Sequence, residues 1–254
     1  MGQHFLGNLS WRKRIFESLP RTGPETWVEI GAGHGEITQL LAEDGRRLIA
    51  IEADPRLAAG LKNEAASWGH VEVVEGDILR LDLEKIVGGD FRVYGNLPYY
   101  ITSPILHQLF GYTDRLNSIH IVVQLEVAER IVAAPGRRDY GYLSAVSQFY
   151  TRPEIAFRIP PGAFRPPPRV HSALLHMTIP GEYASLSVGD ENRFIEFIAA
   201  SFGQKRKTLR NNLLEGVPDE QIRPALADCG LRPDARAEQL SLAQFAKLFA
   251  WGLG

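Results

Sequence analysis

Residues 27–43 read WVEIGAGHGEITQLLAE. The apolar run at the start is typical of a buried strand, and the pattern from residue 36 onward is typical of a helix. Between them, glycines at positions 31, 33 and 35 allow the backbone to turn sharply and to pass close to a ligand. Such a turn lies at the carboxyl end of its strand, where open α/β sheets bind small molecules. The stretch therefore predicts a strand, a ligand-binding turn and a helix.

The alternation of strand and helix patterns continues to about residue 124. Strand-like runs occupy residues 48–52, 71–75, 91–95 and 118–124, and helix-like runs occupy residues 55–66 and 103–110. Asp54 followed by Pro55 predicts a helix start, because aspartate caps a helix and proline suits its first position. Repeated βαβ units form a parallel sheet that helices cover. We therefore expect an α/β fold with a mostly parallel sheet.

The chain after residue 124 predicts two more strands and then a helical domain. Helix patterns at residues 125–134 and 142–150 precede strand patterns at residues 153–159 and 170–179. These late strands are joined by a short proline-rich connection and should pair antiparallel. Residues 179–190 show no clear period, so we expect domains at residues 1–182 and 183–254. The second domain should be all-helical, with helices at residues 191–202, 206–214, 218–228 and 241–251.

The composition excludes several classes of protein. With 254 residues, of which 44% are hydrophobic, the chain can bury a substantial core. No apolar run reaches the roughly 18 to 20 residues that cross a bilayer, and the first residues lack the apolar centre of a signal peptide. We therefore expect a cytoplasmic protein that does not contact membranes. A lone Cys229 and seven scattered histidines provide neither a disulfide nor a ligand spacing, so no metal is expected.

The net charge of −2 argues against a uniformly basic nucleic-acid surface. Any contact with RNA must therefore come from local basic patches. The first patch comprises Arg12, Lys13 and Arg14, and the second comprises Lys205, Arg206, Lys207 and Arg210. On composition alone, a solvated helix face explains either patch better than an RNA contact does.

Acidic residues at the ends of two strand patterns suit a nucleoside. Glu52 ends one strand and can accept hydrogen bonds from both hydroxyls of a ribose, while Asp77 follows the next strand and can accept the amino hydrogens of an adenine. Glu36 replaces the last glycine of the dinucleotide fingerprint and would repel a pyrophosphate. A solvated carboxylate and an Asx turn are the plainer alternatives for Glu52 and Asp77. Together with Gly31 and Gly33, the set favours S-adenosylmethionine over NAD.

Residues 94–103 read YGNLPYYITS and follow the fourth strand pattern. The N6 nitrogen of adenine is a poor nucleophile, because its lone pair is delocalised into the ring. If Asn96 Oδ1 and the Leu97 carbonyl each accept one N6 hydrogen, the nitrogen becomes tetrahedral and its lone pair points at the cofactor methyl group. Pro98 would fix the Leu97 carbonyl, and Tyr99 would stack on the base. A proline turn with a buried aromatic pair is the structural alternative.

These motifs resemble those of the KsgA-type ribosomal RNA adenine dimethyltransferases over essentially the whole chain. The shared segments are GQHFL (2–6), EIGAGHGEIT (29–38), GDIL (76–79), NLPYYITSPIL (96–106), QLEVAERIVAAPG (124–136), YGYLS (140–144), FRPPPRVHS (164–172) and FGQKRKTLRNNL (202–213). The resemblance implies a Rossmann-like class I methyltransferase sheet and a helical rRNA-binding domain at the C-terminus. It also implies a monomer that uses S-adenosylmethionine to dimethylate N6 of two adjacent adenosines in a hairpin loop near the 3′ end of 16S rRNA, during biogenesis of the small ribosomal subunit.

The resemblance also implies roles for particular residues. Those expected to close over or contact the cofactor are His4, Leu6, Gly31, Gly33, Glu52, Asp77 and Asn96. Phe164 would cover the face of the target adenine opposite Tyr99. The family more usually has asparagine at position 4 and proline at position 32, where this chain has His4 and Ala32. The basic run from Lys205 to Arg210 would lie on one face of a helix and contact rRNA phosphates.

Three other functions stay open from the sequence. An enzyme of the same fold methylates a large-subunit rRNA adenine and confers antibiotic resistance; Leu97 in place of isoleucine argues against it. A ribosome-assembly or transcription factor that keeps the fold would act by binding alone, and retention of Asn96, Pro98 and Phe164 argues against that. A nicotinamide-dependent oxidoreductase conflicts with Glu36 and with the lack of a candidate proton donor at the strand ends.

Overall fold

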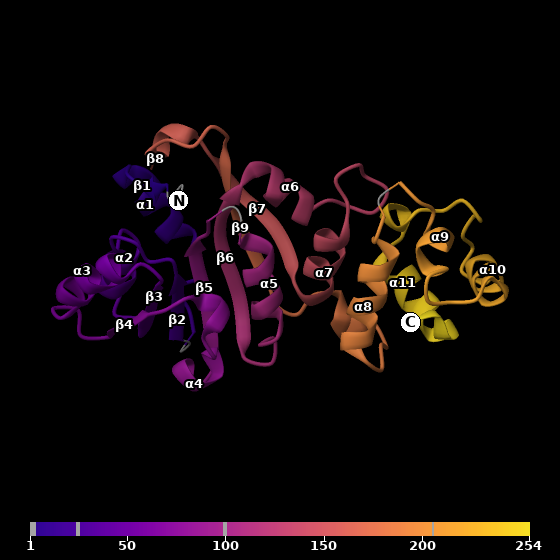
Figure 1. Ribbon diagram of the computed structural model, residues 1–254. Coiled ribbons are helices and arrows are strands. Elements are labelled where there is room, and N and C mark those ends of the chain that lie inside the picture. Colours follow the sequence, from indigo (N-terminus) through magenta and orange to yellow (C-terminus); the bar gives the residue numbers. More distant parts are fainter. Residues whose placement is uncertain (1–3, 24–25, 99–100, 205) are drawn as a thin grey trace. The chain divides into compact units, whose positions relative to one another are not determined.

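A computed structural model describes residues 4–23, 26–98, 101–204 and 206–254 of the chain. The chain divides into two compact units, the first formed by residues 1–128 and 153–179 and the second by residues 129–152 and 180–254 (Figure 1). The division into domains at residues 182 and 183 stays a prediction, and it differs from these units in its placement of residues 129–152. In the described part of the chain, no helix is long and apolar enough to cross a membrane.

The first unit is built on a seven-stranded sheet with the order β4-β3-β2-β5-β6-β9-β7. The strands are β2 (Thr26–Ile30), β3 (Leu48–Glu52), β4 (Val71–Glu75), β5 (Phe91–Asn96), β6 (Leu116–Gln124), β7 (Arg152–Ile159) and β9 (Ser172–Thr178). β2 pairs parallel with β3 and β5, β3 with β4, and β5 with β6, whereas β9 pairs antiparallel with β6. The predicted mostly parallel sheet with an antiparallel late strand is confirmed.

Buried central strands account for the apolar runs of the sequence. Every residue of β2 and β3 is buried, which is the pattern of parallel strands covered by helices on both faces. The connecting helices include α2 (Thr38–Glu43), α3 (Pro55–Ala65), α4 (Leu83–Val87) and α5 (Thr102–Phe110). Asp54 caps α3 as predicted, since its side chain accepts hydrogen bonds from the backbone N–H groups of Arg56 and Leu57. The start of α3 is therefore fixed by its capping residue.

The strand order reverses at β2, and this reversal positions the ligand site. From β2 the chain proceeds to β3 on one side and returns to β5 on the other side. In sheets of this kind, the loops at the carboxyl ends of the two flanking strands diverge and leave a crevice between them. The glycine turn after Ile30 and the segment after Asn96 both lie at this edge.

A second, two-stranded sheet joins the N-terminus to the segment before β9. β1 (Phe5–Leu6) pairs antiparallel with β8 (Phe164–Arg165), with Leu6 opposite Phe164. Both of these side chains are 2% exposed and belong to a hydrophobic cluster that includes Trp27 and Tyr94. The helix α1 (Leu9–Ser18) follows β1, and η2 (Pro161–Ala163) precedes β8. The sequence patterns did not predict this pairing.

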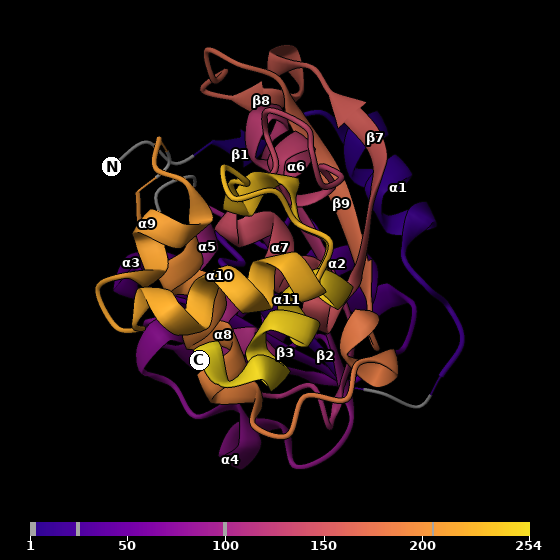
Figure 2. The ribbon, with the colours of Figure 1, turned by 90° about the vertical axis from the view of Figure 1, so that its right-hand side faces the viewer.

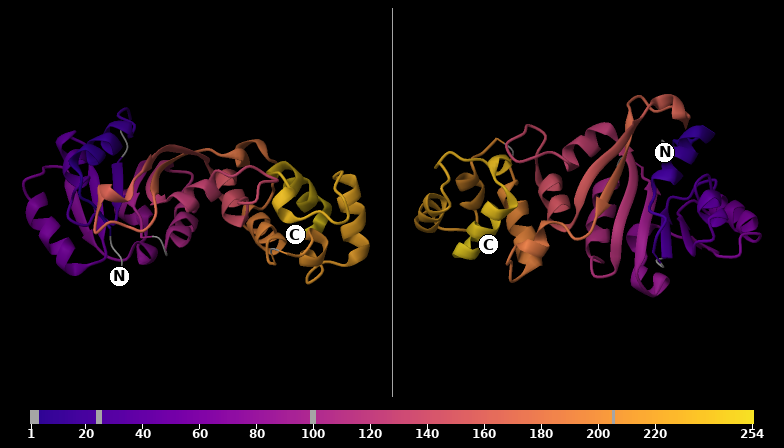
Figure 3. Two further views of the ribbon diagram at one scale, coloured as in Figure 1. Left: turned by 90° about the horizontal axis from the view of Figure 1, so that it is seen from above. Right: turned by 180° about the vertical axis from the view of Figure 1, so that it is seen from behind.

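The second unit is helical. It contains α7 (Tyr142–Tyr150), α8 (Glu191–Ser201), α9 (Leu209–Leu213), α10 (Asp219–Asp228) and α11 (Leu242–Leu248), and α6 (Leu125–Ile131) leads into it (Figure 2). Short helices lie at η3 (Glu182–Ser185), η4 (Ala237–Gln239) and η5 (Phe249–Leu253), and η1 (Ile78–Arg80) follows β4 in the first unit. Aromatic rings form much of the core, with Phe149, Phe194, Phe197 and Phe245 buried. The orange and yellow helices in Figure 3 are those from α8 onward, and they confirm the predicted helical C-terminal region.

Candidate active site

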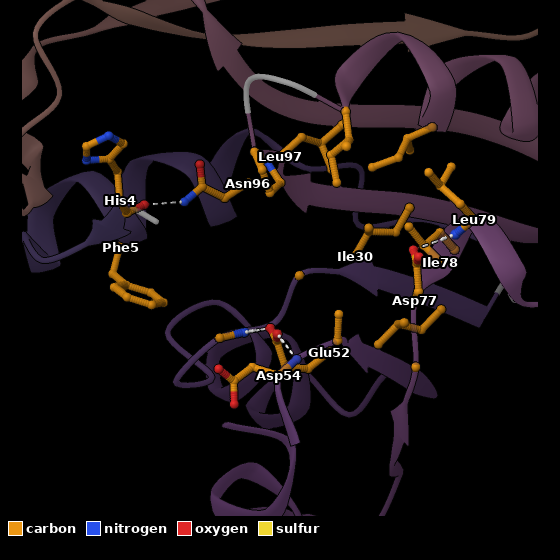
Figure 4. Close-up of a pocket in the computed structure, with 18 of the residues that line it drawn as sticks. His4, Phe5, Ile30, Glu52, Asp54, Asp77, Ile78, Leu79, Asn96 and Leu97 are labelled. Carbon is orange, nitrogen blue, oxygen red and sulfur yellow. Dashed lines mark hydrogen bonds between the residues drawn. The ribbon is translucent and has the colours of Figure 1, made fainter. Parts of the chain in front are cut away.

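A cavity of about 440 Å³ lies at the carboxyl ends of β2, β3 and β5. Its walls come from the glycine turn after β2, the residues after β3, the turn after β4 and the segment that follows β5. The N-terminal residues His4 and Phe5 complete it on one side (Figure 4). Segments far apart in the sequence therefore meet at the edge of the sheet where a ligand was expected.

The glycine turn holds its shape through backbone conformations that favour glycine. Gly31 has a φ angle of 72° and Gly33 a φ angle of 59°, both in the left-handed region. The N–H of Gly31 donates to the Ile51 carbonyl at 2.9 Å, which joins the turn to β3. A Cβ atom at Gly33 would lie 3.0 Å from the ring of Phe5. The turn thus brings bare backbone to the cavity and packs closely against the N-terminal segment.

Glu52 lies at the end of β3 and organises the neighbouring backbone. Its Oε2 accepts a hydrogen bond from the N–H of Gly33 at 2.8 Å, and its Oε1 accepts one from the N–H of Asp54 at 2.9 Å (Figure 4). The residue is 4% exposed and lines the cavity. Each carboxylate oxygen can accept more than one hydrogen bond, so acceptor capacity remains for hydroxyl groups of a ligand. Glu52 therefore lines the cavity with both carboxylate oxygens fixed by backbone hydrogen bonds, and its role as the ribose acceptor stays a prediction.

Asp77 forms an Asx turn and also lines the cavity, while its role as the adenine acceptor stays a prediction. Its Oδ1 accepts a hydrogen bond from the N–H of Leu79 at 3.1 Å, which is the capping arrangement of an Asx turn. The same residue also lines the cavity, together with Ile78 and Leu79. These two apolar residues were not predicted as site residues. The signal for them was available, because they directly follow an acidic residue at a strand end, where a nucleobase needs a flat apolar surface.

Asn96 ends β5 and faces the cavity. Its Nδ2 donates a hydrogen bond to the main-chain carbonyl of His4 at 2.9 Å (Figure 4). A carbonyl can only accept, so the amide nitrogen must face it, and Oδ1 is turned to the other side as an acceptor. Among the described residues, none donates a hydrogen bond to Asn96 Oδ1.

The segment after Asn96 is fixed by its backbone. Leu97 N–H donates to the Val122 carbonyl at 3.1 Å, and Ile101 N–H donates to the Pro98 carbonyl at 3.2 Å. Leu97 and Pro98 line the cavity, and their catalytic roles stay predictions, while Tyr99 lies outside the described residues. Glycine at position 95 allows close packing, because a Cβ atom there would lie 2.8 Å from the side chain of Leu97 and 3.1 Å from the Ile30 carbonyl.

Two residues assigned to the site by resemblance lie in the hydrophobic cluster of the first unit. Leu6 and Phe164 are each 2% exposed and pack in this cluster. Phe5, which was not predicted, supplies the side chain that lines the cavity. Neighbouring residues of a strand point to opposite faces, so only one of Phe5 and Leu6 can face the ligand. The predicted contacts of Leu6 with the cofactor and of Phe164 with the adenine stay predictions.

The charge of the cavity distinguishes between candidate ligands. Glu52, Asp54 and Asp77 contribute carboxylates to its lining, and the described lining residues include no lysine or arginine. A pyrophosphate would therefore meet only like charge, whereas a sulfonium and an ammonium group would be attracted. S-adenosylmethionine carries both of these cationic groups together with a ribose and an adenine, so the residues fit it.

Among the described residues, no group of three or more His, Cys, Asp or Glu side chains could hold a metal ion.

A buried carboxyl group lies beneath the glycine turn. Burial raises the pKa of Glu29 to about 8, with smaller contributions from the Glu36 and Glu52 carboxylates. A hydrogen bond from Thr38 acts in the opposite direction. Glu29 is therefore mostly protonated and neutral at pH 7. The sequence reasoning missed this residue, because burial of a carboxyl group cannot be read from its position in the motif.

Two residues of the first basic patch are engaged within the protein. Arg12 Nε donates to the carbonyl of Leu6, and its Nη2 lies 3.7 Å from Glu36 Oε1. The guanidinium of Arg14 lies over the ring of Phe157, 4.3 Å from its centroid. Lys13 is exposed. RNA binding by this patch therefore stays a prediction, and the structure supports it least for Arg12.

The second basic run does not lie on one helix face. The helix α9 begins only at Leu209, so Arg206 and Lys207 precede it, and the predicted helix over residues 206–214 is too long at its start. Both side chains are exposed, whereas Lys205 lies outside the described residues. The cause is Thr208, whose side chain accepts a hydrogen bond from the N–H of Asn211 and thereby starts the helix after the basic run.

Arg210, the last member of that run, is held in a two-point ion pair. Its Nε and Nη2 donate to the two carboxylate oxygens of Asp219 at 2.5 and 2.8 Å. These hydrogen bonds lower the pKa of the Asp219 carboxyl to about 2. Arg210 therefore joins α9 to α10. Binding of RNA by Arg210 stays a prediction, and its guanidinium would have to contact a phosphate while it is paired with Asp219.

The sheet order, the glycine turn and the acidic nucleoside cavity define an S-adenosylmethionine-dependent methyltransferase of the Rossmann-like class. A family model described as ribosomal RNA adenine dimethylase matches residues 1–252, and the chain belongs to this family. The protein is thus an rRNA adenine N6,N6-dimethyltransferase that uses S-adenosylmethionine.

Curated relatives agree with this assignment. The ribosomal RNA small subunit methyltransferase A of Koribacter versatilis is 43% identical, over 98% of this chain and 92% of the relative. The protein of the same name from Xanthomonas campestris pv. campestris is 41% identical, over 98% and 93% of the two chains.

Solved structures show the same fold. A dimethyladenosine transferase from Plasmodium falciparum matches with a TM-score of 0.81 and 22% identity, over 97% of this chain and 96% of that chain. The 23S rRNA methyltransferase ErmE matches with a TM-score of 0.72 and 25% identity, over 97% and 98% of the two chains. Both matches extend over residues of the two units, so the helical unit is part of the shared fold.

Proposed function

We propose that this enzyme dimethylates N6 of two adjacent adenosines in a hairpin loop near the 3′ end of 16S rRNA, during biogenesis of the small ribosomal subunit. The names of the relatives from Koribacter versatilis and Xanthomonas campestris support the choice of the small subunit. We also propose that it acts as a cytoplasmic monomer. The observation that carries the catalytic part of the proposal is the orientation of the Asn96 amide.

Asn96 and Leu97 would activate the adenine by accepting its amino hydrogens. The hydrogen bond from Asn96 Nδ2 to the His4 carbonyl fixes the amide plane, so Oδ1 needs no reorientation when the base enters. The hydrogen bond of Leu97 N–H to Val122 holds the adjoining peptide in place. Two fixed acceptors draw the N6 nitrogen toward a tetrahedral geometry and free its lone pair. Positioning and electrostatics supply the catalysis. After the new N–C bond forms, the positively charged N6 loses one hydrogen to water as a proton, so no general base is needed.

The cofactor would occupy the acidic part of the cavity. Its ribose hydroxyls would be held by Glu52, its adenine by Asp77 against Ile78 and Leu79, and its amino-acid end near the glycine turn. When bound, S-adenosylmethionine supplies an electrophilic methyl group on a sulfonium. The carboxylates of the lining favour binding of the cationic cofactor over its neutral product, which aids product release.

The proposal is tested with unmethylated small ribosomal subunits and labelled S-adenosylmethionine, followed by nucleoside analysis. We expect dimethyladenosine in 16S rRNA at two adjacent positions. Asn96→Ala should lower kcat by about 10² to 10³ while the affinity for RNA is retained. Asn63→Ala, on the exposed surface of α3, is the matched control and should behave as the unaltered enzyme. Unaltered turnover of Asn96→Ala would refute the role assigned to this residue.

Methylation of 23S rRNA is the second candidate, because the 23S rRNA methyltransferase ErmE shares the fold over almost the whole of both chains. Primer extension on both rRNAs separates the two functions, since a dimethylated adenine blocks the polymerase. A block that occurs only on the large-subunit rRNA would overturn the choice of the small subunit. Sedimentation of the purified enzyme tests the proposed monomer.

A further inference from the structure

Arg12 connects two parts of the chain that border the cofactor cavity. It lies in the first helical turns of α1, and its Nε donates to the carbonyl of Leu6. Its Nη2 lies 3.7 Å from Glu36 Oε1, on the turn that carries the glycines. The two side chains are only 26% and 15% exposed, so the pair is shielded from water. Arg12 thus spans the N-terminal strand and the glycine turn.

The strand that Arg12 holds is too short to be stable alone. β1 consists of Phe5 and Leu6, and among the described residues its strand partner is the two-residue β8. A two-stranded sheet of this length is marginal in water, so β1 depends on side-chain contacts for its position. Burial of Leu6 supplies one such contact, and the hydrogen bond from Arg12 supplies another.

Both functional sides of the cavity depend on where this strand lies. On one side, the His4 carbonyl accepts the hydrogen bond that orients the Asn96 amide. On the other side, the Phe5 ring packs against Gly33 and lies 4.7 Å from the ring of His34. A shift of β1 would therefore change the catalytic amide and the glycine turn together.

We propose that Arg12 is a positioning residue for methyl transfer. By joining the Leu6 carbonyl to Glu36, it holds β1 against the glycine turn, and it thereby orients Asn96 and shapes the S-adenosylmethionine site. The inference rests on the catalytic role proposed for Asn96. Arginine suits the task because its planar guanidinium presents donors in several directions, whereas the single ammonium of lysine cannot bridge two acceptors in the same way. This role replaces the RNA contact predicted for Arg12.

The first test compares Arg12→Met with Lys85→Met. Lys85 has an exposed side chain that forms an ion pair with Asp82 at 3.1 Å, and neither residue lines the cavity, so the control removes a lysine from an ion pair outside the site. Calorimetric titration should show that Arg12→Met raises the Kd for S-adenosylmethionine about tenfold, whereas Lys85→Met changes it by less than about twofold. An equal Kd in the two variants would overturn the proposal.

The second test is a double-mutant cycle with Asn96→Ala, measured as kcat at saturating cofactor and RNA. If Arg12 acts through Asn96, then Arg12→Met lowers kcat about tenfold in the normal background and causes no further loss in the Asn96→Ala background. If the fold-losses in kcat of the two single variants multiply in the double variant, then Arg12 and Asn96 act independently, and the proposal is overturned. If Asn96→Ala lowers kcat as expected but Arg12→Met leaves kcat unchanged, only this inference is refuted. The proposed function is then still supported.

Arg12→Lys covers the case in which Arg12→Met does not fold. It keeps the positive charge beside Glu36, so its melting temperature should stay near that of the unaltered protein. Its kcat should nevertheless fall, because the bridge to the Leu6 carbonyl is lost. An Arg12→Lys variant with normal kcat and normal cofactor affinity would overturn the proposal. At each of several salt concentrations, the RNA affinity should be the same for both Arg12 variants and the unaltered enzyme. A smaller slope of log K against log salt concentration in the variants would indicate that Arg12 contacts RNA phosphates.

Discussion

Thr38 Oγ1 donates a hydrogen bond to Glu29 Oε2 at 2.6 Å, inside the first unit where neither side chain reaches water. The pKa of Glu29 is raised to about 8, chiefly by this burial. A carboxyl group whose pKa is higher in the folded state than in the unfolded state favours folding while it is protonated. That contribution is complete below pH 4.5 and is lost as the pH rises toward 8. Glu29 therefore makes the stability of the fold decrease as the pH rises from about 4.5 to about 8.

We expect Glu29→Gln to be more stable than the unaltered protein at pH 8 and similar to it at pH 5. Glutamine keeps an acceptor for Thr38 but does not ionise. The difference in melting temperature should grow by at least about 4 °C between the two pH values, as measured by calorimetry. Parallel melting curves over this range would show that Glu29 remains ionised in the fold.

The paired histidines of β6 and β9 should make the fold sensitive to acid. His120 and His176 lie opposite each other, with ring centroids 4.6 Å apart. Burial lowers the pKa of His120 to about 3, and burial also lowers the pKa of His176. The folded state thus favours neutral rings, while the unfolded chain binds protons below about pH 6.5. Stability should fall as the pH decreases through this value.

Chemical denaturation at pH 7 and pH 5 measures this effect. The unaltered protein should lose up to about 1.4 kcal/mol of unfolding free energy per pH unit from His120, and His120→Gln should lose less. His70→Gln, which alters an exposed histidine before β4, is the matched control and should keep the full slope. An unchanged slope in His120→Gln would contradict the expected neutral state of this ring.

Glu52 should be essential for cofactor affinity. In Glu52→Gln, one carboxylate oxygen becomes an NH₂ group, which would face either the N–H of Gly33 or that of Asp54. Two donors then oppose each other in a buried place, and the charge-assisted acceptor for a ribose is lost. The Kd for S-adenosylmethionine should rise roughly tenfold to a hundredfold in calorimetric titration.

Glu75→Gln is the control for Glu52→Gln. Glu75 lies opposite Glu52 at the end of the neighbouring strand β4, but it is exposed and does not belong to the cavity wall. Its replacement removes the same charge from the same edge of the sheet. Equal losses in the two variants would mean that general electrostatic attraction, and not the hydrogen bonds of Glu52, determines cofactor affinity.

The basic residues before α9 and the paired Arg210 should behave differently toward RNA. Replacing Lys205, Arg206 and Lys207 with glutamine should weaken RNA binding and lower the salt slope of log K by about 2, because each phosphate contact contributes roughly 0.7 to 0.9. Arg210→Gln should mainly lower the melting temperature, since it removes the two-point ion pair with Asp219. If Arg210→Gln changes the salt slope and the triple variant does not, the assignment of the two roles is reversed.

The sheet could be predicted because its information is local. The strands β2 and β3 are short apolar runs, the first followed by Gly31 and the second ended by Glu52. Those ends also carry the site, so the glycine turn, Glu52, Asp77 and Asn96 could all be placed at one edge of the sheet from strand order alone. The outcome follows from the parallel geometry, which brings all carboxyl ends together.

Contacts between distant segments could not be predicted. Phe5 and Leu6 form a strand only because Arg165 and Phe164 lie beside them, and two residues carry no periodic pattern. No sequence pattern indicated that Phe5 would line the cavity, and Leu6 was assigned to the cofactor by the family resemblance alone. The partners of the arginines were equally hidden, since Asp219 belongs to a helix that follows Arg210 and packs against it. Such pairs depend on tertiary geometry, which one sequence does not display.

Residues 129–152, which lie between β6 and β9 in the sequence, belong to the second unit. This order affects how the sheet forms during synthesis of the chain. When translation has reached residue 128, the growing sheet ends at β6, whose central residues are all buried in the mature protein. Until β9 is synthesised, β6 is an edge strand with unpaired backbone N–H and C=O groups and exposed apolar side chains. A neighbouring chain can pair with this edge. A protein truncated within residues 129–152 would therefore aggregate rather than persist as a smaller methyltransferase.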